Sequence, residues 1–256
     1  QEQQITDAIK NHDVRYVIHL AALQVPFCKA NPSMGANVNV VGTVNLYESV
    51  RNANLKHVAL ASSVGVYGPP ELYPKGLVDA DADFKPDTLY GVYKQANEGT
   101  ARVYWQDHGI SSVILRPYTI YGVGRDQGLT SEPTKAMLAA AKGEDFEIGF
   151  GGFMQFHFAS DVAKQFIEAA ETPVDGAKGF NLGTEPVAVT ELAKLIERTK
   201  PAIRISNTQN TLPFPEGLDS GDYKNYSQVP LTPINEGVYQ TVKYFERCLH
   251  DKTLAN

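Results

Sequence analysis

Tyr90 and Lys94 have the spacing that places two side chains on one face of a helix, about one turn apart. A phenol titrates at about pH 10, so alone it is a weak base at neutral pH. A positive charge at close range favours the phenolate and lowers its pKa. Ser63, at the end of an apolar run, has a hydroxyl that can hold a substrate oxygen against the same phenol. Together these side chains could move a proton on or off an alcohol while a hydride leaves or reaches its carbon.

The spacing alone does not identify a site, because Tyr239 and Lys243 repeat it near the C-terminus. That second pair lies in an amphipathic pattern, which is typical of a tyrosine at a helix edge and a solvated lysine. Only the sequence around Tyr90 and Lys94 can therefore distinguish them from the second pair.

Apolar runs typical of buried strands alternate with amphipathic patterns along the first half of the chain. The predicted strands are 14–20, 57–62 and 112–115, and the predicted helices are 4–11, 35–52 and 88–108. This alternation favours an α/β fold with a doubly wound parallel sheet. Ligands of such sheets bind at the carboxyl ends of the strands. Ala21 and Ala22, Ser63, and Pro117 and Tyr118 all follow predicted strands and should converge on one cleft.

The second half of the chain is richer in loops, with predicted helices at 132–142, 161–171 and 190–199. We expect residues 1–120 to form a dinucleotide-binding, Rossmann-like domain. Residues 121–256 should form mainly a smaller substrate-binding lobe, with 155–183 packing back on the sheet.

The composition excludes several classes of function. A net charge of -6 argues against nucleic acid and against an anionic membrane surface as partners. Two cysteines fit a reducing compartment and favour a cytoplasmic location. No apolar stretch is long enough to span a bilayer, and the scattered histidines predict no metal site.

Several short motifs in a fixed order resemble the extended branch of the short-chain dehydrogenase/reductase superfamily, the NAD-dependent epimerase/dehydratase family. The segments are HLAA (19–22), NVVGTVNL (39–46), SSVGVYG (62–68), YGVYK (90–94), LRPYTIYG (115–122) and FNLG (180–183). Each segment alone is weak evidence for the family, but the whole set in this order and spacing is specific for it. The resemblance implies a nicotinamide cofactor, NAD or NADP, and a homodimer formed through the helices that start near Gly35 and Thr88.

The resemblance also implies roles for individual residues. Tyr90 would be the acid and base, Lys94 would tune it and hold the nicotinamide ribose, and Ser63 would orient the substrate oxygen. The cofactor would be lined by Ala21, Ala22, Pro117 and Tyr118. Asn39 would brace a helix rather than touch substrate.

One departure from the family concerns the cofactor. The Gly-rich turn that lets backbone approach a pyrophosphate is absent from the sequence. We expect the chain to lack the first strands of the usual fold, either as a fragment, which we favour, or as a naturally shortened protein. The choice between NAD and NADP stays open.

Other departures concern the substrate. Val64 and Gly65 stand where 4,6-dehydratases carry an Asp-Glu pair, which argues against dehydration. Met154 and Thr119 stand where nucleotide-sugar enzymes hold the diphosphate with an arginine and an asparagine. Loss of a bidentate cation weakens binding of a diphosphate. A small sugar, sugar acid or lactone is therefore the favoured substrate.

The candidate substrate contacts are Ser63, Thr119 and Arg125. Arg125 could meet a carboxylate, or it could be a solvated loop arginine paired with Asp126.

Three functions remain open from the sequence. The first is an NAD(P)-dependent oxidoreductase that interconverts a secondary alcohol or lactol and a ketone or lactone on a small sugar-like substrate. The second is a sugar or nucleotide-sugar epimerase that uses the same Ser63, Tyr90 and Lys94. The third is a cofactor-free truncated binding protein.

Overall fold

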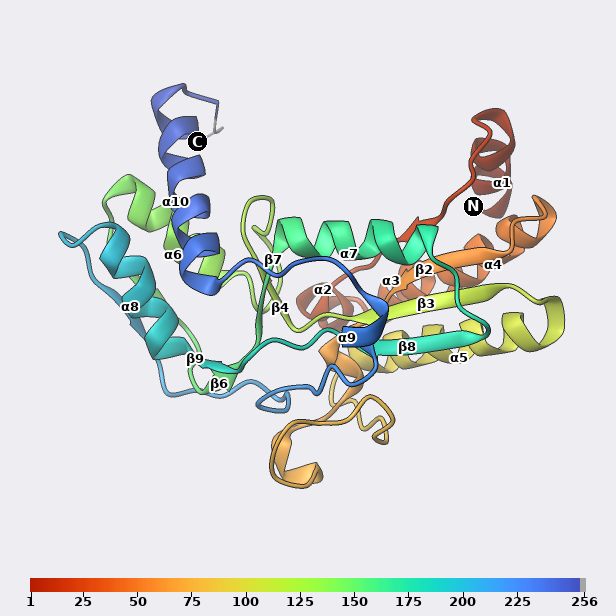
Figure 1. Cartoon of the computed structure of the whole chain (residues 1–256), viewed down its shortest axis with the longest axis horizontal. Coiled ribbons are helices and arrows are strands. Elements are labelled where there is room, and N and C mark those ends of the chain that lie inside the picture. The colour runs from red at the N-terminus through yellow and green to blue at the C-terminus, as the bar shows by residue number, and fades with distance from the viewer. Residues whose placement is uncertain (254–256) are drawn as a thin grey trace.

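The computed structural model describes residues 1–253 and contains a central parallel sheet (Figure 1). Its strand order is β1-β2-β3-β8, and every neighbouring pair is parallel. The strands are β1 (Ile18–His19), β2 (His57–Ala61), β3 (Ser111–Arg116) and β8 (Ala177–Asn181). The parallel α/β architecture predicted from the sequence is confirmed.

Helices cover both faces of this sheet, as parallel crossover connections require (Figure 1). On one face lies α7 (Ala159–Glu171), which contacts β1, β2 and β3. On the other face α4 (Gly42–Asn52) and α5 (Leu89–His108) lie side by side, with α1 (Glu2–Asn11) against α4. Apolar side chains cover both sides of the sheet, with Val58 and Leu60 facing α4 and Ala59 and Val113 facing α7.

The first strand is shorter and more exposed than the sequence predicts. Residues 14–20 read as one buried strand, but only Ile18 and His19 pair with β2. Tyr16 and Leu20 are each 57% exposed. Among the described residues β1 pairs on one side only, so side chains that a second neighbour would cover face outward.

The predicted helix 35–52 is interrupted. It consists of α3 (Pro32–Ala36), a π-helical turn (Asn37–Val41) and α4. Single π turns inside helices are frequent at functional sites. Here the turn faces the segment that links β1 to α2 (Val25–Ala30).

Much of the second half of the chain packs around a second apolar core at the other end of the molecule, which Val66, Tyr67 and Val78 of the first half also join (Figure 1). Three helices, α6 (Glu132–Lys142), α8 (Val189–Thr199) and α10 (Ile234–His250), contact one another there. Short strand pairs connect them: β4 (Thr119–Tyr121) with β7 (Phe156–Phe158), β5 (Phe146–Ile148) with β10 (Ile205–Asn207), and β6 (Phe153–Met154) with β9 (Val187–Ala188). A short α9 (Tyr223–Tyr226) lies near β8. The proposed division into domains at residue 120 stays a prediction.

None of the helices in residues 1–253 combines the length and apolar character needed to cross a bilayer.

Candidate active site

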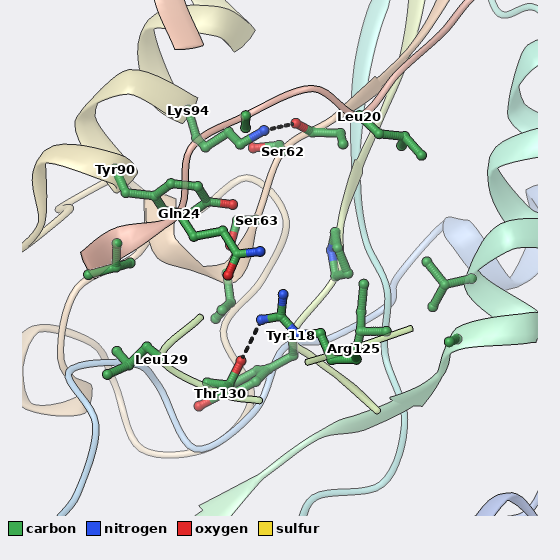
Figure 2. Close-up of a pocket in the computed structure, with 18 of the residues that line it drawn as sticks. Leu20, Gln24, Ser62, Ser63, Tyr90, Lys94, Tyr118, Arg125, Leu129 and Thr130 are labelled. Atoms are coloured by element: carbon green, nitrogen blue, oxygen red, sulfur yellow. Dashed lines mark hydrogen bonds between the residues drawn. The ribbon is translucent and has the colours of Figure 1, made fainter. Parts of the chain in front are cut away.

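A cavity of about 350 Å³ opens where β1, β2 and β3 end (Figure 2). Its walls come from the segments that follow these strands, from the start of α5, from α7 and from the loop after β4. The predicted site residues that line it are Ala22, Ser63, Tyr90, Lys94, Pro117, Tyr118 and Arg125. The convergence expected at the carboxyl ends of the strands is present.

Two predicted residues do not line this cavity. Ala21 is exposed and lies outside its wall. Thr119 is fully buried, and its hydroxyl lies 3.7 Å from the sulfur of Met154. A hydroxyl enclosed in this way is not placed to meet a substrate, which corrects the expectation for Thr119.

The start of α5 places Tyr90 against the turn that carries Ser63. Thr88 caps the helix, because its hydroxyl accepts a hydrogen bond of 3.0 Å from the backbone N–H of Gly91. Gly91 has its Cα against the carbonyl oxygen of Gly65, and any side chain there would collide with that backbone. The missing Cβ lets the helix approach the turn closely.

Ser63 is oriented by the backbone around it. Its hydroxyl accepts a hydrogen bond of 3.1 Å from the N–H of Gly65, which closes a turn at Val64–Val66. The same hydroxyl lies close enough to the phenol of Tyr90 to lower its pKa. A Cβ on Gly65 would contact the Tyr90 ring at 3.3 Å, so this position leaves little room for a larger residue.

Lys94 lies one turn further along α5 and is 3% exposed. Its amine donates a hydrogen bond of 2.6 Å to the carbonyl oxygen of Ala61 and lies 5.7 Å from the centroid of the Tyr90 ring. Burial lowers the pKa of Lys94 to about 8, and the charge of Glu98 opposes this shift. Burial, together with the charge of Lys94, lowers the pKa of His19 to about 4, so His19 is neutral at pH 7.

The surroundings of Tyr90 shift its pKa in both directions. Burial raises the pKa, while the Ser63 hydroxyl and the charge of Arg125 lower it. Arg125 is therefore a second cation near the phenol, in addition to Lys94, whose amine lies 5.7 Å from the centroid of the Tyr90 ring.

Arg125 follows β4 and points into the cavity (Figure 2). One terminal nitrogen donates a hydrogen bond of 3.1 Å to the hydroxyl of Thr130. Within residues 1–253 its Nε has no hydrogen-bond partner and its guanidinium forms no ion pair, so the pairing with Asp126 is not formed. Burial lowers the pKa of Arg125, as expected for a cation withdrawn from water.

Gln24 is a cavity residue that the sequence reasoning missed (Figure 2). Asn39, buried in the π-helical turn, holds its segment in place. The side-chain oxygen of Asn39 accepts a bond of 2.7 Å from the N–H of Leu23, and its amide nitrogen donates one of 2.8 Å to the carbonyl of Leu23. The only signal in the sequence was a polar residue just after a predicted strand.

A buried ion pair beneath the cavity was also missed. Arg116 donates two hydrogen bonds to the carboxylate of Glu98, at 2.9 and 2.7 Å, and both side chains are under 10% exposed. Glu98 also accepts a bond of 2.5 Å from the hydroxyl of Ser62, next to Ser63. The carboxylate of Glu98 therefore fixes both the end of β3 and the segment after β2 to α5.

The described residues fit the nicotinamide riboside end of a dinucleotide. Tyr90 and Lys94 supply polar groups at one wall, and Ala22, Pro117 and Val162 supply apolar surface for a planar ring. In residues 1–253 no three His, Cys, Asp or Glu side chains lie close enough to bind a metal ion.

The model of the NAD dependent epimerase/dehydratase family matches residues 1–183. An uncharacterized protein of Methanocaldococcus jannaschii is 31% identical over 94% of this chain and 75% of its own length. UDP-glucuronate 4-epimerase 2 of Arabidopsis thaliana is 28% identical over 90% of this chain. The chain spans 58% of the length of that plant protein.

Solved structures share the fold. MoeE5 in complex with UDP-glucose and NAD is 25% identical and superposes with a TM-score of 0.82, over 96% of this chain and 83% of that one. A partial consensus L-threonine 3-dehydrogenase is 20% identical with a TM-score of 0.88, over 96% and 83% of the two chains.

Proposed function

Since the chain belongs to the NAD dependent epimerase/dehydratase family, we propose that it interconverts an alcohol or lactol and a ketone or lactone on a small sugar-like substrate. The family and its relatives are NAD-dependent enzymes of the extended short-chain dehydrogenase type, so this chain is an enzyme of that type. The binding-protein alternative is set aside. The observation that carries the proposal is the position of Ser63, Tyr90 and Lys94 on one cavity.

The roles of these residues follow from their contacts. The substrate hydroxyl lies between Ser63 and Tyr90, and the phenolate of Tyr90 takes its proton as the carbon is oxidised. Bound nicotinamide supplies the acceptor or donor of the hydride. Lys94, held against Ala61, presents a buried amine for the ribose hydroxyls. In the reverse direction Tyr90 returns the proton to the carbonyl oxygen.

A substrate without a nucleotide is supported by the region around Met154. The positions that correspond to a diphosphate-binding arginine and asparagine are Met154 and Thr119, and their side chains contact each other in the interior. No cation stands at either place to meet a diphosphate.

The alternative is an epimerase that oxidises and re-reduces one carbon with the cofactor retained. It is favoured by the name of the Arabidopsis relative, UDP-glucuronate 4-epimerase. The same three side chains serve both reactions. The two reactions differ in whether the nicotinamide cofactor undergoes a net change for each substrate converted.

The test is a panel of aldoses, uronic acids and aldonic acids, with UDP-glucuronate included, incubated with NAD or NADP. Net reduction of the nicotinamide, followed by its absorbance, supports the dehydrogenase. A new stereoisomer with no net absorbance change supports the epimerase. Absence of any conversion, while the protein is folded, contradicts both.

A further inference from the structure

Two buried polar groups of the cavity lack partners in the described part of the chain: the side-chain oxygen of Gln24 and the Nε of Arg125. An unpaired buried polar group destabilises the folded chain, so such groups tend to mark ligand positions. One is an acceptor and the other is a charged donor. Neither touches the reacting hydroxyl in the proton transfer assigned to Ser63 and Tyr90, where Arg125 acts only through its charge.

The two groups lie side by side. Both pack against Gly128, where an added Cβ would contact the Gln24 amide and would lie 3.2 Å from a terminal nitrogen of Arg125. Gly128 has a φ of +97°, which favours glycine, so the loop can curve tightly over both side chains. Figure 2 shows Gln24 between Tyr90 and Arg125. The order of polar groups along the wall is therefore Tyr90, Gln24, Arg125, Thr130.

We propose that the substrate is a polyhydroxy acid whose carboxylate pairs with Arg125 while a neighbouring hydroxyl donates to Gln24. This inference rests on the proposed function, because the reacting hydroxyl occupies the position at Tyr90 and Ser63. A carboxylate matches the planar guanidinium, which can donate two parallel hydrogen bonds. An adjacent hydroxyl supplies the donor that the Gln24 oxygen lacks.

The charges around the cavity favour a monoanion over a more highly charged group. Of the residues that the structure describes, Arg125 and Lys94 are the cations that line it, and the amine of Lys94 is already bonded to the carbonyl of Ala61. One free guanidinium balances one carboxylate. The Gln24 oxygen would repel a second negative charge placed beside it.

The experiment measures binding of matched acid and neutral pairs by calorimetry. D-Galacturonate is compared with D-galactose, and D-gluconate with D-glucitol, because each pair differs at one carbon by a carboxylate. We expect at least one acid to bind tenfold or more tightly than its neutral partner. The preference should disappear in Arg125→Met, and Arg125→Lys should retain part of it. Gln24→Met should weaken both members of a pair by a similar factor, because the hydroxyl is common to both.

Equal binding of acid and neutral compounds, failure of every acid to bind, or a preference that survives in a folded Arg125→Met variant overturns the inference. Failure of the proposed function gives a different result from failure of this inference. If acids bind to wild type and to Tyr90→Phe but are never oxidised or epimerised, the binding site stands and the reaction is wrong. If only neutral sugars turn over, the reaction stands and the acid specificity is wrong.

Discussion

The amine of Lys94 lies 5.7 Å from the centroid of the Tyr90 ring, and the amine of Lys243 lies at the same distance from the Tyr239 ring. The helical spacing sets this separation in both pairs. The surroundings differ, because Lys94 is buried at a cavity while Tyr239 is 54% exposed on α10. The second pair is thus an internal control for the first.

Replacing Tyr90 by phenylalanine should lower kcat/KM by a factor on the order of 10² to 10⁴, because it removes the group that carries the proton. Tyr239→Phe should leave kcat/KM within about twofold of wild type, since surface substitutions change little. Steady-state kinetics on the best substrate of the panel compare the two. Equal losses in both variants would contradict the assignment of Tyr90.

The buried amine of Lys94 should make stability depend on pH. Its pKa is about 8 in the folded chain and rises to the ordinary value of 10.5 on unfolding. Between these values the unfolded chain binds more protons, so the contribution of Lys94 to stability rises with pH. Below about pH 8 the lysine is charged in both states, and the full cost of burying it is present.

Lys94→Met removes this contribution. The stability of the variant relative to wild type should therefore be greatest near pH 7 and should fall, by on the order of 3 kcal/mol, as the pH rises to about 10.5. Urea denaturation of both proteins at several pH values measures the difference. A difference that does not change with pH would show that Lys94 is not buried as a cation.

The sheet was predictable from sequence because its strands are local apolar runs, such as 57–62, separated by long amphipathic helices. The placement of Tyr90 and Ser63 followed, since carboxyl ends of parallel strands share one edge. The length of β1 could not be predicted in the same way. Burial of residues such as Tyr16 depends on a neighbouring strand or helix, which the local sequence pattern does not reveal.

The polar wall of the cavity was harder to predict. Gln24 reaches it because Asn39, on a different element, clamps the backbone of Leu23. Arg125 adds a second positive charge near Tyr90 because the loop after β4 brings it to the same cavity. Both outcomes depend on contacts between segments distant in sequence.

Close approach of α5 to the Ser63 turn should make Gly91→Ala damaging. Its Cβ would meet the carbonyl of Gly65 and would lie 2.8 Å from Pro86, so the helix start must move away and carry Tyr90 from Ser63. We expect both kcat and the melting temperature to fall. Gly99→Ala, in the same helix with open space around it, should instead raise stability by about 0.5–1 kcal/mol. Calorimetric melting and kcat test both, and unchanged kcat in Gly91→Ala would refute the role of this contact.

The expected homodimer has apolar side chains available on neighbouring helices. Val38 and Val41 on the π-helical turn, and Val92 and Val103 on α5, are all more than a third exposed. Val92→Glu should lower the sedimentation coefficient at micromolar concentration, because a charge at an apolar interface weakens association. Ile167→Glu, on exposed surface of α7, should leave it unchanged. A wild-type protein that sediments as a monomer would disprove the dimer.

Breaking the ion pair between Glu98 and Arg116 should be costly, because it leaves a buried cation without its partner. Glu98→Gln should lower the free energy of unfolding by about 3–5 kcal/mol. Glu191→Gln, which breaks the exposed pair with Lys194, should change it little.

Denaturant unfolding of both variants gives the comparison. Ser62 shares the Glu98 carboxylate and adjoins Ser63, so loosening this segment should also lower kcat in Glu98→Gln at temperatures where the variant remains folded. If Glu98→Gln has the same free energy of unfolding and the same kcat as wild type, the ion pair stabilises neither the core nor the position of Ser63.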